Sequence, residues 1–365
     1  MSTQTRPTAS PWLARFRTGI AGVAESLATP LVPADYLDLV SPLRAGADLR
    51  GRIVAITPET PDAATVTIRP GRGWLGHRPG QYIRIGVDVD GVRNWRAYSL
   101  THGPDQPAGT ISITVKAIEN GVVSNHLVRR TRPGTLVMLD QATGEFCLPE
   151  RLPGKVLFVT AGSGITPVMG MLRHHLDDLE DVVLVHSAPT ASDVVFGRRL
   201  RAYAASGRLT LHERATDEVG MLDLAELDSL VPDWREREAW TCGPTGLLDA
   251  AEAHWEAEGL ADRHHVERFR PTVIEPGEGG TVTFAASGKV VEADGATPIL
   301  DAGEDAGVLL PSGCRMGICF GCVSTLRQGA VRDLRNGEIT VAEPGDDLPV
   351  QTCVNAAAGP CEIDR

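Results

Sequence analysis

Four cysteines in the C-terminal quarter of the chain have the spacing of ligands for an iron–sulfur cluster. Cys314, Cys319 and Cys322 form a C-x4-C-x2-C sequence, and Cys353 follows further along. This spacing is typical of plant-type [2Fe-2S] ligation, in which thiolates hold two irons. The glycines between these cysteines suit a loop that curls tightly and aims backbone N–H groups at the sulfides. We therefore predict a redox centre held by these four thiolates.

Two other interpretations of the cysteines stay open. A structural zinc site is one, although zinc ribbons usually pair two C-x2-C knuckles, whereas here one loop is completed by a single distant cysteine. Cys361 also competes with Cys353 for the fourth position. The segment Gln351-Thr352-Cys353 resembles the fourth-ligand segment of plant-type ferredoxins, and residues 281–365 as a whole resemble such a ferredoxin.

Two segments in the first half of the chain resemble, in order, the flavin-binding segments of the ferredoxin-NAD(P)+ reductase superfamily. On a strand, an arginine and a tyrosine are by themselves more often a solvated charge and a packing residue. The resemblance implies that Arg96 neutralises the flavin pyrophosphate, that Tyr98 packs against the isoalloxazine, and that Ser99 bonds near N5. It also implies that the ribityl chain and phosphate are held by Val115, Gly121, Val123 and Ser124.

A glycine-rich segment follows the predicted strand 155–160 and opens a predicted helix, the context that turns a glycine pattern into a phosphate cradle. It resembles the G-x-G-I-T-P segment of the same superfamily, and its candidate nucleotide-binding residues are Gly162, Gly164, Thr166 and Pro167. Pro167 replaces a third glycine and suits a first helical turn. A bare strand-to-helix turn is the alternative.

A second nicotinamide element and one carboxyl group complete the candidate site. Cys242, Gly243 and Pro244 end a predicted strand and resemble the superfamily's C-G-P element beside the nicotinamide. A lone cysteine at a strand end is otherwise a small core residue. Glu267 closes the reductase segment and is a candidate polar group at the flavin. Ser99, Cys242 and Glu267 are therefore the candidate catalytic residues.

The elements around these motifs predict a multidomain fold. Short β-rich runs between residues 47 and 150 predict an antiparallel β-barrel, which the resemblance implies binds flavin. Strands and helices alternate from residue 151 to 270, which predicts an α/β nicotinamide domain with a parallel sheet. A Pro- and Gly-rich linker at 271–280 leads to a ferredoxin domain of the α+β, β-grasp-like class at 281–365. Residues 1–46 form an N-terminal arm in which Trp12, Phe16 and Ile20 make an apolar stripe.

Composition limits the partners and the location. The net charge of −12 argues against nucleic acid, and no segment is apolar enough to span a membrane. Seven cysteines, four of them in one region, favour a reducing cytoplasm over a disulfide framework. We expect a monomer, with peripheral membrane contact through the N-terminal arm.

The order of the motifs resembles a three-domain oxygenase or desaturase reductase. The resemblance implies electron flow from NAD(P)H through FAD and a [2Fe-2S] cluster to a terminal oxygenase or desaturase. Residues 32–43 resemble the arm of reductases that serve membrane-bound di-iron acyl desaturases and hydroxylases; a soluble Rieske-type oxygenase is the alternative acceptor. A redox sensor is disfavoured because the flavin and nicotinamide segments are all present. We expect NADPH to be preferred, because an acidic ribose clamp does not directly follow His186, whereas Arg198, Arg199 and Arg201 lie nearby.

Overall fold

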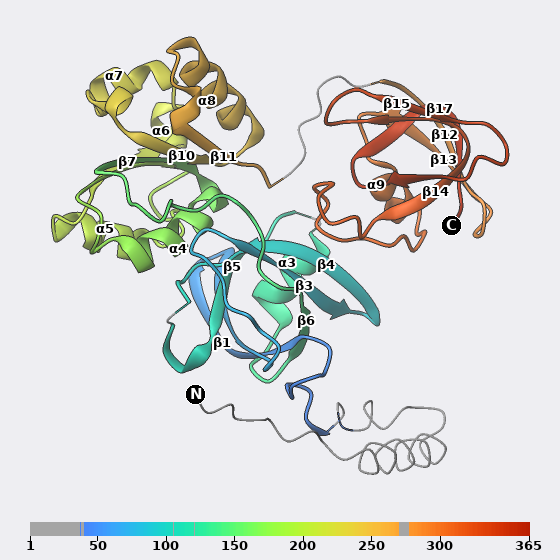
Figure 1. The fold of residues 1–365 in the computed structure, drawn as a ribbon, viewed down its shortest axis with the longest axis horizontal. Helices are drawn as coiled ribbons and strands as arrows, with labels where there is room; N and C mark the ends of the chain where they lie inside the picture. The colour runs from blue at the N-terminus through green and yellow to red at the C-terminus, as the bar shows by residue number, and fades with distance from the viewer. Residues whose placement is uncertain (1–36, 38–39, 105, 120, 270–276) are drawn as a thin grey trace, which may run out of the picture.

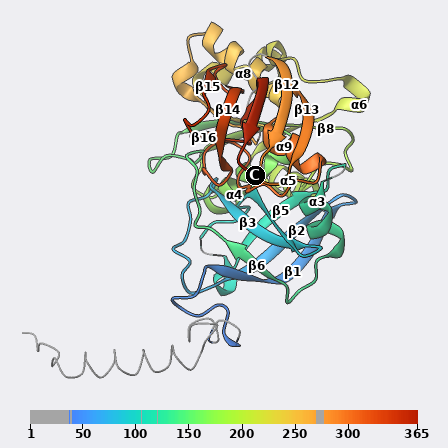
Figure 2. The ribbon, with the colours of Figure 1, turned by 90° about the vertical axis from the view of Figure 1, so that its right-hand side faces the viewer.

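The computed structural model describes residues 37, 40–104, 106–119, 121–269 and 277–365, which build three sheets with separate hydrophobic cores (Figure 1). Most of the predicted N-terminal arm, including its apolar stripe, lies outside the described residues, as does the first part of the predicted linker. Within the described ranges, every helix is too short or too polar to cross a membrane. In Figure 2 the C-terminal sheet faces the viewer, above the strands of the first sheet.

The first sheet is the predicted antiparallel barrel. Its strands follow the order β4-β3-β6-β1-β2-β5, and a bridge between Leu100 and Ile113 brings the two edge strands together. Alternating side chains such as Val66, Ile83 and Ile113 are fully buried, as expected for strands that face a core on one side. The elements are β1 (Arg50–Thr60), β2 (Ala63–Pro70), β3 (Tyr82–Val89), β4 (Val92–Ser99), β5 (Ile111–Lys116), α3 (Val122–Asn125) and β6 (Leu136–Leu139).

The second sheet is the predicted parallel sheet, in the order β11-β10-β7-β8-β9. Residues Val156 to Val159 of its central strand are all completely buried, which is typical of a strand covered on both faces by helices. The elements are β7 (Lys155–Ala161), α4 (Ile165–His175), β8 (Asp181–Ala188), α5 (Gly197–Ala205), β9 (Thr210–Ala215), α6 (Thr216–Val219), α7 (Leu227–Leu230), β10 (Glu238–Cys242), α8 (Thr245–Ala257) and β11 (His264–Glu267).

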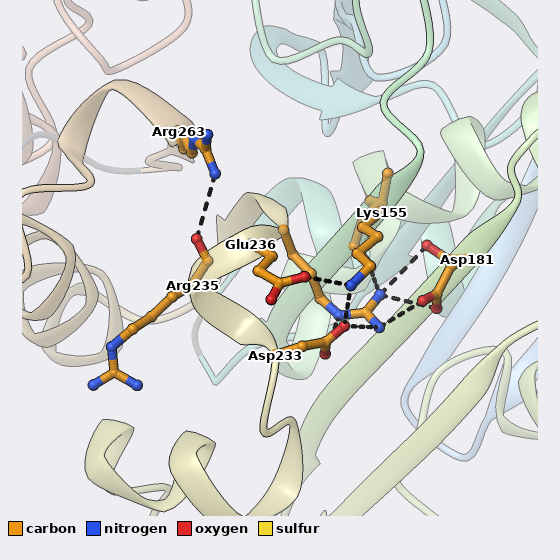
Figure 3. A network of polar contacts seen from close by, with 8 residues as sticks. Lys155, Asp181, Asp233, Arg235, Glu236 and Arg263 are labelled. Carbon is orange, nitrogen blue, oxygen red and sulfur yellow. Dashed lines mark hydrogen bonds and ion pairs between the residues drawn. The ribbon is translucent and has the colours of Figure 1, made fainter.

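A buried arginine, Arg237, forms ion pairs at the amino ends of the strands of the parallel sheet. The Arg237 side chain is 5% exposed and contacts Asp181 at 2.7 Å and Asp233 at 2.8 Å. Lys155 adds a further contact to Asp233 at 3.0 Å, and Figure 3 shows these carboxylates around the base of the sheet. The pKa of Asp233 is lowered to about 2, chiefly by its hydrogen bonds from Arg237. The network lies at the amino ends of the strands, where Lys155 begins β7 and Asp181 begins β8.

The third sheet has the β-grasp-like arrangement expected for a ferredoxin domain. Its order is β13-β12-β17-β14-β15, with β16 paired to β14, and β12 and β17 run parallel. Phe284 and Ile299 pack the single helix of this domain against the sheet. The elements are β12 (Gly277–Phe284), β13 (Lys289–Gly295), α9 (Ile299–Asp305), β14 (Val323–Asp333), β15 (Ile339–Ala342), β16 (Leu348–Gln351) and β17 (Asn355–Ile363).

Strand β12 corrects the end of the predicted linker. It begins at Gly277, so residues 277–280 belong to the sheet and do not form a linker. Their glycines have a packing role: a methyl group on Gly280 would collide with the carbonyl group of Gly359, and Gly279 has a φ of +78°. Glycine is required here for close backbone approach and left-handed conformation, which in sequence looks the same as flexibility.

The barrel and the parallel sheet meet along helix α4. A methyl group on Gly170 would collide with the carbonyl oxygen of Leu100, so the helix backbone lies directly against the barrel. Arg173 of the same helix donates to the Thr101 carbonyl at 2.7 Å and to Nδ1 of His102 at 2.9 Å. Burial and the charge of Arg173 lower the pKa of His102 to about 3, which keeps this imidazole neutral as an acceptor.

Candidate flavin, nicotinamide and iron–sulfur sites

The first predicted flavin segment lies on β4, at the edge of the barrel next to α4. Ser99 is 4% exposed, and among the described residues its Oγ has no hydrogen-bond partner. Tyr82 of β3 is its cross-strand neighbour. Burial raises the pKa of the Tyr98 hydroxyl, and it lowers the pKa of Arg96. A buried hydroxyl without a protein partner fits a site in which a bound flavin supplies that partner.

The second predicted flavin segment surrounds the short helix α3. Gly121 is the residue before the helix, and the Ser124 hydroxyl donates to its carbonyl at 3.3 Å. Val123 and Val115 are buried in the barrel core. The structure therefore places Gly121 and Ser124 at a helix start, where backbone N–H groups attract phosphate, and gives the two valines a packing role beneath it.

The predicted nucleotide cradle lies at the carboxyl ends of the parallel strands. Gly162 has a φ of +55°, a conformation that glycine adopts without strain, and Thr166 Oγ1 donates to the Ser163 carbonyl at 2.9 Å. A methyl group on Gly164 would lie 2.7 Å from the backbone nitrogen of Gly243. The two nicotinamide motifs therefore touch, with Pro167 in the first turn of α4 and Pro244 before α8. Ligands of open parallel sheets bind at this edge.

Glu267 lies beside Cys242 on the neighbouring strand, in direct register. Its Oε2 is buried and, among the described residues, has no hydrogen-bond partner. Burial raises the pKa of Glu267 to about 8, and burial together with the Glu267 charge raises the pKa of Cys242. Burial raises the pKa of Tyr82, the cross-strand neighbour of Ser99, and the charge of Glu267 contributes to the same increase. Ser99, Cys242 and Glu267 therefore gather at one seam between the barrel and the parallel sheet.

The four candidate cluster ligands form two pairs. The Cys322 thiol donates to Cys353 Sγ at 3.1 Å, and the backbone N–H of Cys314 donates to Cys319 Sγ at 3.1 Å. Within the described ranges, no three Cys, His, Asp or Glu side chains converge as they would on a single metal ion. Two pairs of thiols suit two irons with two protein ligands each. Cys361 is instead buried in the core of the β-grasp sheet.

Backbone amides around the first pair are directed at sulfur. The N–H groups of Met316 and Gly321 donate to Cys314 Sγ at 3.3 Å and to Cys319 Sγ at 3.4 Å. A hydrogen bond shared with the Cys314 side chain, the backbone N–H groups of Cys314 and Gly321, and the charge of Arg84 lower the pKa of Cys319. Thiolate ligation of iron requires this kind of surrounding, so the donor set and its amides fit a [2Fe-2S] cluster.

The arginines predicted to reach a 2′-phosphate are only partly available. Arg201 Nε contacts Glu213 Oε2 at 2.8 Å and its Nη2 donates to the Ala191 carbonyl at 2.9 Å. Arg198 and Arg199 are exposed. Asp193, the nearby acid, accepts a hydrogen bond from the Thr190 hydroxyl at 2.6 Å. The preference for NADPH stays a prediction, and it depends on Arg198 and Arg199.

Several residues at the domain contacts were missed from sequence. Tyr82 and Arg84 of β3 face the cluster-binding loop, residues 313–322, and Arg173 joins α4 to the barrel. No spacing signal marks them, because each acts on a residue far away in the chain. Only the alternation along β3, which places Tyr82 and Arg84 opposite Ser99 and Ala97, would have suggested that they share a face with the flavin strand.

The fold and the site together define an NAD(P)H-dependent flavin reductase that carries its own ferredoxin domain. Family models agree with this organisation: the oxidoreductase FAD-binding domain matches residues 60–147, the oxidoreductase NAD-binding domain residues 158–253, and the 2Fe-2S iron–sulfur cluster binding domain residues 282–357. The chain belongs to the family of NAD(P)H oxidoreductases in which these three domains form one polypeptide.

Several similar proteins match this chain over most of their own length. An NADPH oxidoreductase of Mycobacterium tuberculosis (strain ATCC 25618 / H37Rv) is 51% identical, with 94% of this chain and 91% of that protein covered. The ferredoxin reductase component of a 3-ketosteroid-9-alpha-monooxygenase from Mycolicibacterium smegmatis (strain ATCC 700084 / mc(2)155) is 30% identical over 81% of this chain and 90% of its own. The structure of phthalate dioxygenase reductase covers 87% of this chain and 97% of its own, with a TM-score of 0.61 at 22% identity, which shows the shared fold.

Proposed function

We propose that this NAD(P)H–FAD–[2Fe-2S] reductase delivers electrons to a membrane-bound di-iron acyl desaturase or hydroxylase. When bound, FAD would supply acceptance of two electrons as hydride and their release one at a time, and the cluster would supply a one-electron carrier. The observation that carries the proposed order of transfer is the position of Tyr82. It is the cross-strand neighbour of Ser99, and Arg84, two residues further along the same strand, lies against the loop that carries Cys314 and Cys319.

The residues of the chain would divide this work among themselves. Gly162, Gly164 and Thr166 hold the nucleotide phosphates at the start of α4, and Gly243 and Pro244 shape the nicotinamide pocket. Arg96 offsets the flavin pyrophosphate charge, and Ser99 offers the orphaned Oγ near the flavin ring. With a pKa of about 8, Glu267 is neutral at pH 7 and holds a proton on its carboxyl group at this seam.

Two features support the choice of acceptor. Residues 32–43 resemble the arm of reductases for membrane desaturases, and residues 281–365 carry twelve acidic and six basic side chains, which suits a basic docking surface. The second candidate is a soluble Rieske-type oxygenase. Relatives that are reductase parts of oxygenases support an oxygenase as the acceptor, among them the glycine betaine monooxygenase reductase subunit of Pseudomonas aeruginosa (strain UCBPP-PA14), 29% identical over 86% of this chain and 94% of that protein.

The two acceptors are separated by deleting the N-terminal arm. Full-length protein and a variant lacking residues 1–46 are assayed with NADPH and three acceptors: ferricyanide, a membrane preparation containing a di-iron desaturase, and a purified Rieske-type oxygenase. We expect the deletion to slow only the membrane-coupled reaction. Equal slowing of ferricyanide reduction would contradict a docking role for the arm, and efficient coupling to the oxygenase alone would favour the second candidate.

A further inference from the structure

Arg84 lies where the flavin barrel meets the cluster-binding loop, which we define as residues 313–322. Its side chain is 19% exposed. A methyl group built on Gly313 would lie 3.0 Å from Arg84 Nη2, and one on Gly321 would lie 3.2 Å from the same atom. The guanidinium group therefore rests on the loop backbone on both sides of Cys319, although Arg84 belongs to another domain.

Arg84 is held in place by its own domain. Its Nη1 contacts Asp140 Oδ2 at 3.1 Å, and the Asp140 N–H donates to the Arg84 carbonyl at 3.0 Å. The guanidinium carbon lies 5.2 Å from the ring centroid of Trp95 on β4, within cation–π range. An ion pair, a backbone hydrogen bond and a ring contact thus fix the side chain from the barrel side, so it offers the loop a preformed contact.

The charge of Arg84 lies beside one predicted iron ligand. The space above Gly313 is shared by the guanidinium group and by Cys319 Sγ, since a methyl group there would meet both. A fixed positive charge in a partly buried place stabilises the more negative of two redox states. A reduced [2Fe-2S] cluster carries one more negative charge than the oxidised cluster, and nearby charge is one determinant of its potential.

A neighbouring arginine shows that this contact is part of a wider interface. Arg315 of the cluster-binding loop pairs with Asp301 of α9 at 2.6 Å and also with Glu304. Burial is the main cause that lowers the pKa of Arg96. The charge of Arg315 lowers it further, and the charges of Glu304 and Asp301 raise it. Arg96 has a predicted role at the flavin pyrophosphate, so it cannot report on the interface alone. Arg84 has no such predicted role.

We propose that Arg84 is a positioning residue for electron transfer within the protein. It holds the cluster-binding loop against the flavin barrel through the backbone at Gly313 and Gly321, and its charge beside Cys319 raises the reduction potential of the cluster. The two effects favour the same step, because one keeps the donor and acceptor close and the other favours the reduced cluster. The inference rests on the proposed ligand set of four cysteines.

The test compares Arg84→Gln with Arg93→Gln in protein loaded with FAD and cluster. Arg93 is a matched control, because it lies on β4 of the same hairpin and pairs with Asp88 of its own domain at 2.7 Å. Cluster content is verified by electron paramagnetic resonance of the reduced protein. Redox titration then measures the midpoint potential, stopped-flow absorbance measures the rate of cluster reduction after flavin reduction, and small-angle X-ray scattering measures the radius of gyration.

For Arg84→Gln we expect the equilibrium constant for cluster reduction to fall about threefold to tenfold, the larger value being 59 mV for a one-electron couple. We also expect slower cluster reduction, a larger radius of gyration, and unchanged ferricyanide reduction by NADPH. Arg93→Gln should match the parent in every measurement. Parent-like potential and rate in fully loaded Arg84→Gln protein would overturn the proposal.

Two outcomes need a further variant. If Arg84→Gln purifies without cluster, Arg84→Lys is measured in its place, because lysine keeps the charge but not the planar guanidinium fork. A parent-like potential with slower transfer is then expected, and a parent-like rate overturns the proposal. If the Cys319→Ser and Cys353→Ser proteins keep the parental cluster signal, the proposed ligand set is wrong, and that result is distinct from a failure at Arg84.

Discussion

Replacing Glu267 by glutamine should change how the stability of the reductase depends on pH. The carboxyl group is buried beside Cys242, its Oε2 lacks a partner among the described residues, and its pKa rises from 4.5 to about 8. Between these two values the folded protein binds a proton that the unfolded chain has released. Stability contributed by this group is therefore complete below pH 4.5 and is lost as the pH rises to about 8.

The magnitude follows from proton linkage. One proton bound by the folded state alone changes the free energy of unfolding by about 1.4 kcal/mol per pH unit, so the full window corresponds to roughly 5 kcal/mol. Glutamine does not titrate. The stability of Glu267→Gln relative to the parent should therefore rise steadily from pH 5 to about 8 and then level off.

The assay is urea unfolding of flavin-loaded protein at pH 5, 6, 7, 8 and 9, followed by tryptophan fluorescence. Trp234, Trp240 and Trp255 are completely buried in the parallel-sheet domain and report its unfolding. Glu256→Gln, on the exposed surface of α8, serves as the control and should differ from the parent by the same amount at every pH. If the Glu267→Gln and parent curves also remain parallel across this range, the carboxyl group is ionised in the folded protein and the reasoning is refuted.

Three further changes test other parts of the molecule. The Cys319→Ser protein should bind FAD and reduce ferricyanide with NADPH almost normally. It should lose most cytochrome c reduction, because a hydroxyl is a poor ligand for iron. Intact cytochrome c reduction after spectroscopic proof of cluster loss would show that electrons leave from FAD. Steady-state kinetics should give a higher kcat/KM with NADPH than with NADH, and Arg199→Gln should reduce that difference; a higher value with NADH would contradict the prediction. Arg237→Met should cost about 2–3 kcal/mol in urea unfolding, because Asp181 and Asp233 lose their buried partner, whereas Arg235→Met on the surface should cost much less. In the parent, the part of this stability that depends on Asp233 should be lost as the pH falls from about 4 towards 2.

The local motifs were predictable from sequence because each is set by neighbouring residues. The cysteine spacing of the cluster-binding loop and the glycine turn after β7 depend on how a short segment folds. The structure has the expected turn between β7 and α4, and the four cluster ligands stay a prediction. Short strands between turns predicted the barrel, and alternating strands and helices predicted the parallel sheet, whereas the ferredoxin-like sheet was expected from the resemblance of residues 281–365 to plant-type ferredoxins.

Long-range contacts were not predictable in the same way. The glycines at 277–280 were interpreted as a linker because a single sequence cannot distinguish a flexible glycine from one that faces the Gly359 backbone. The alternating pattern likewise did not show that a 3₁₀ turn at Leu224–Glu226, begun by a capping box between Asp223 and Glu226, precedes the four-residue α7. The pairing of Cys322 with Cys353, and the contact of Arg84 with the cluster-binding loop, exist only once the domains are folded and docked.

Helix α4 fixes the distance between the parallel sheet and the barrel. Its amino end begins at the nucleotide cradle, where Gly164 lies against the Cys242–Gly243 backbone, and Gly170 touches the Leu100 carbonyl next to Ser99. At 1.5 Å per residue, the helix separates these two contacts by about 9 Å. The hydrogen bonds of the helix and the backbone contacts at its two glycines set this separation. It does not depend on the conformation of any side chain. Thermal motion of side chains therefore has little influence on the span that a nicotinamide nucleotide must bridge, and a ligand of the wrong length is rejected by geometry.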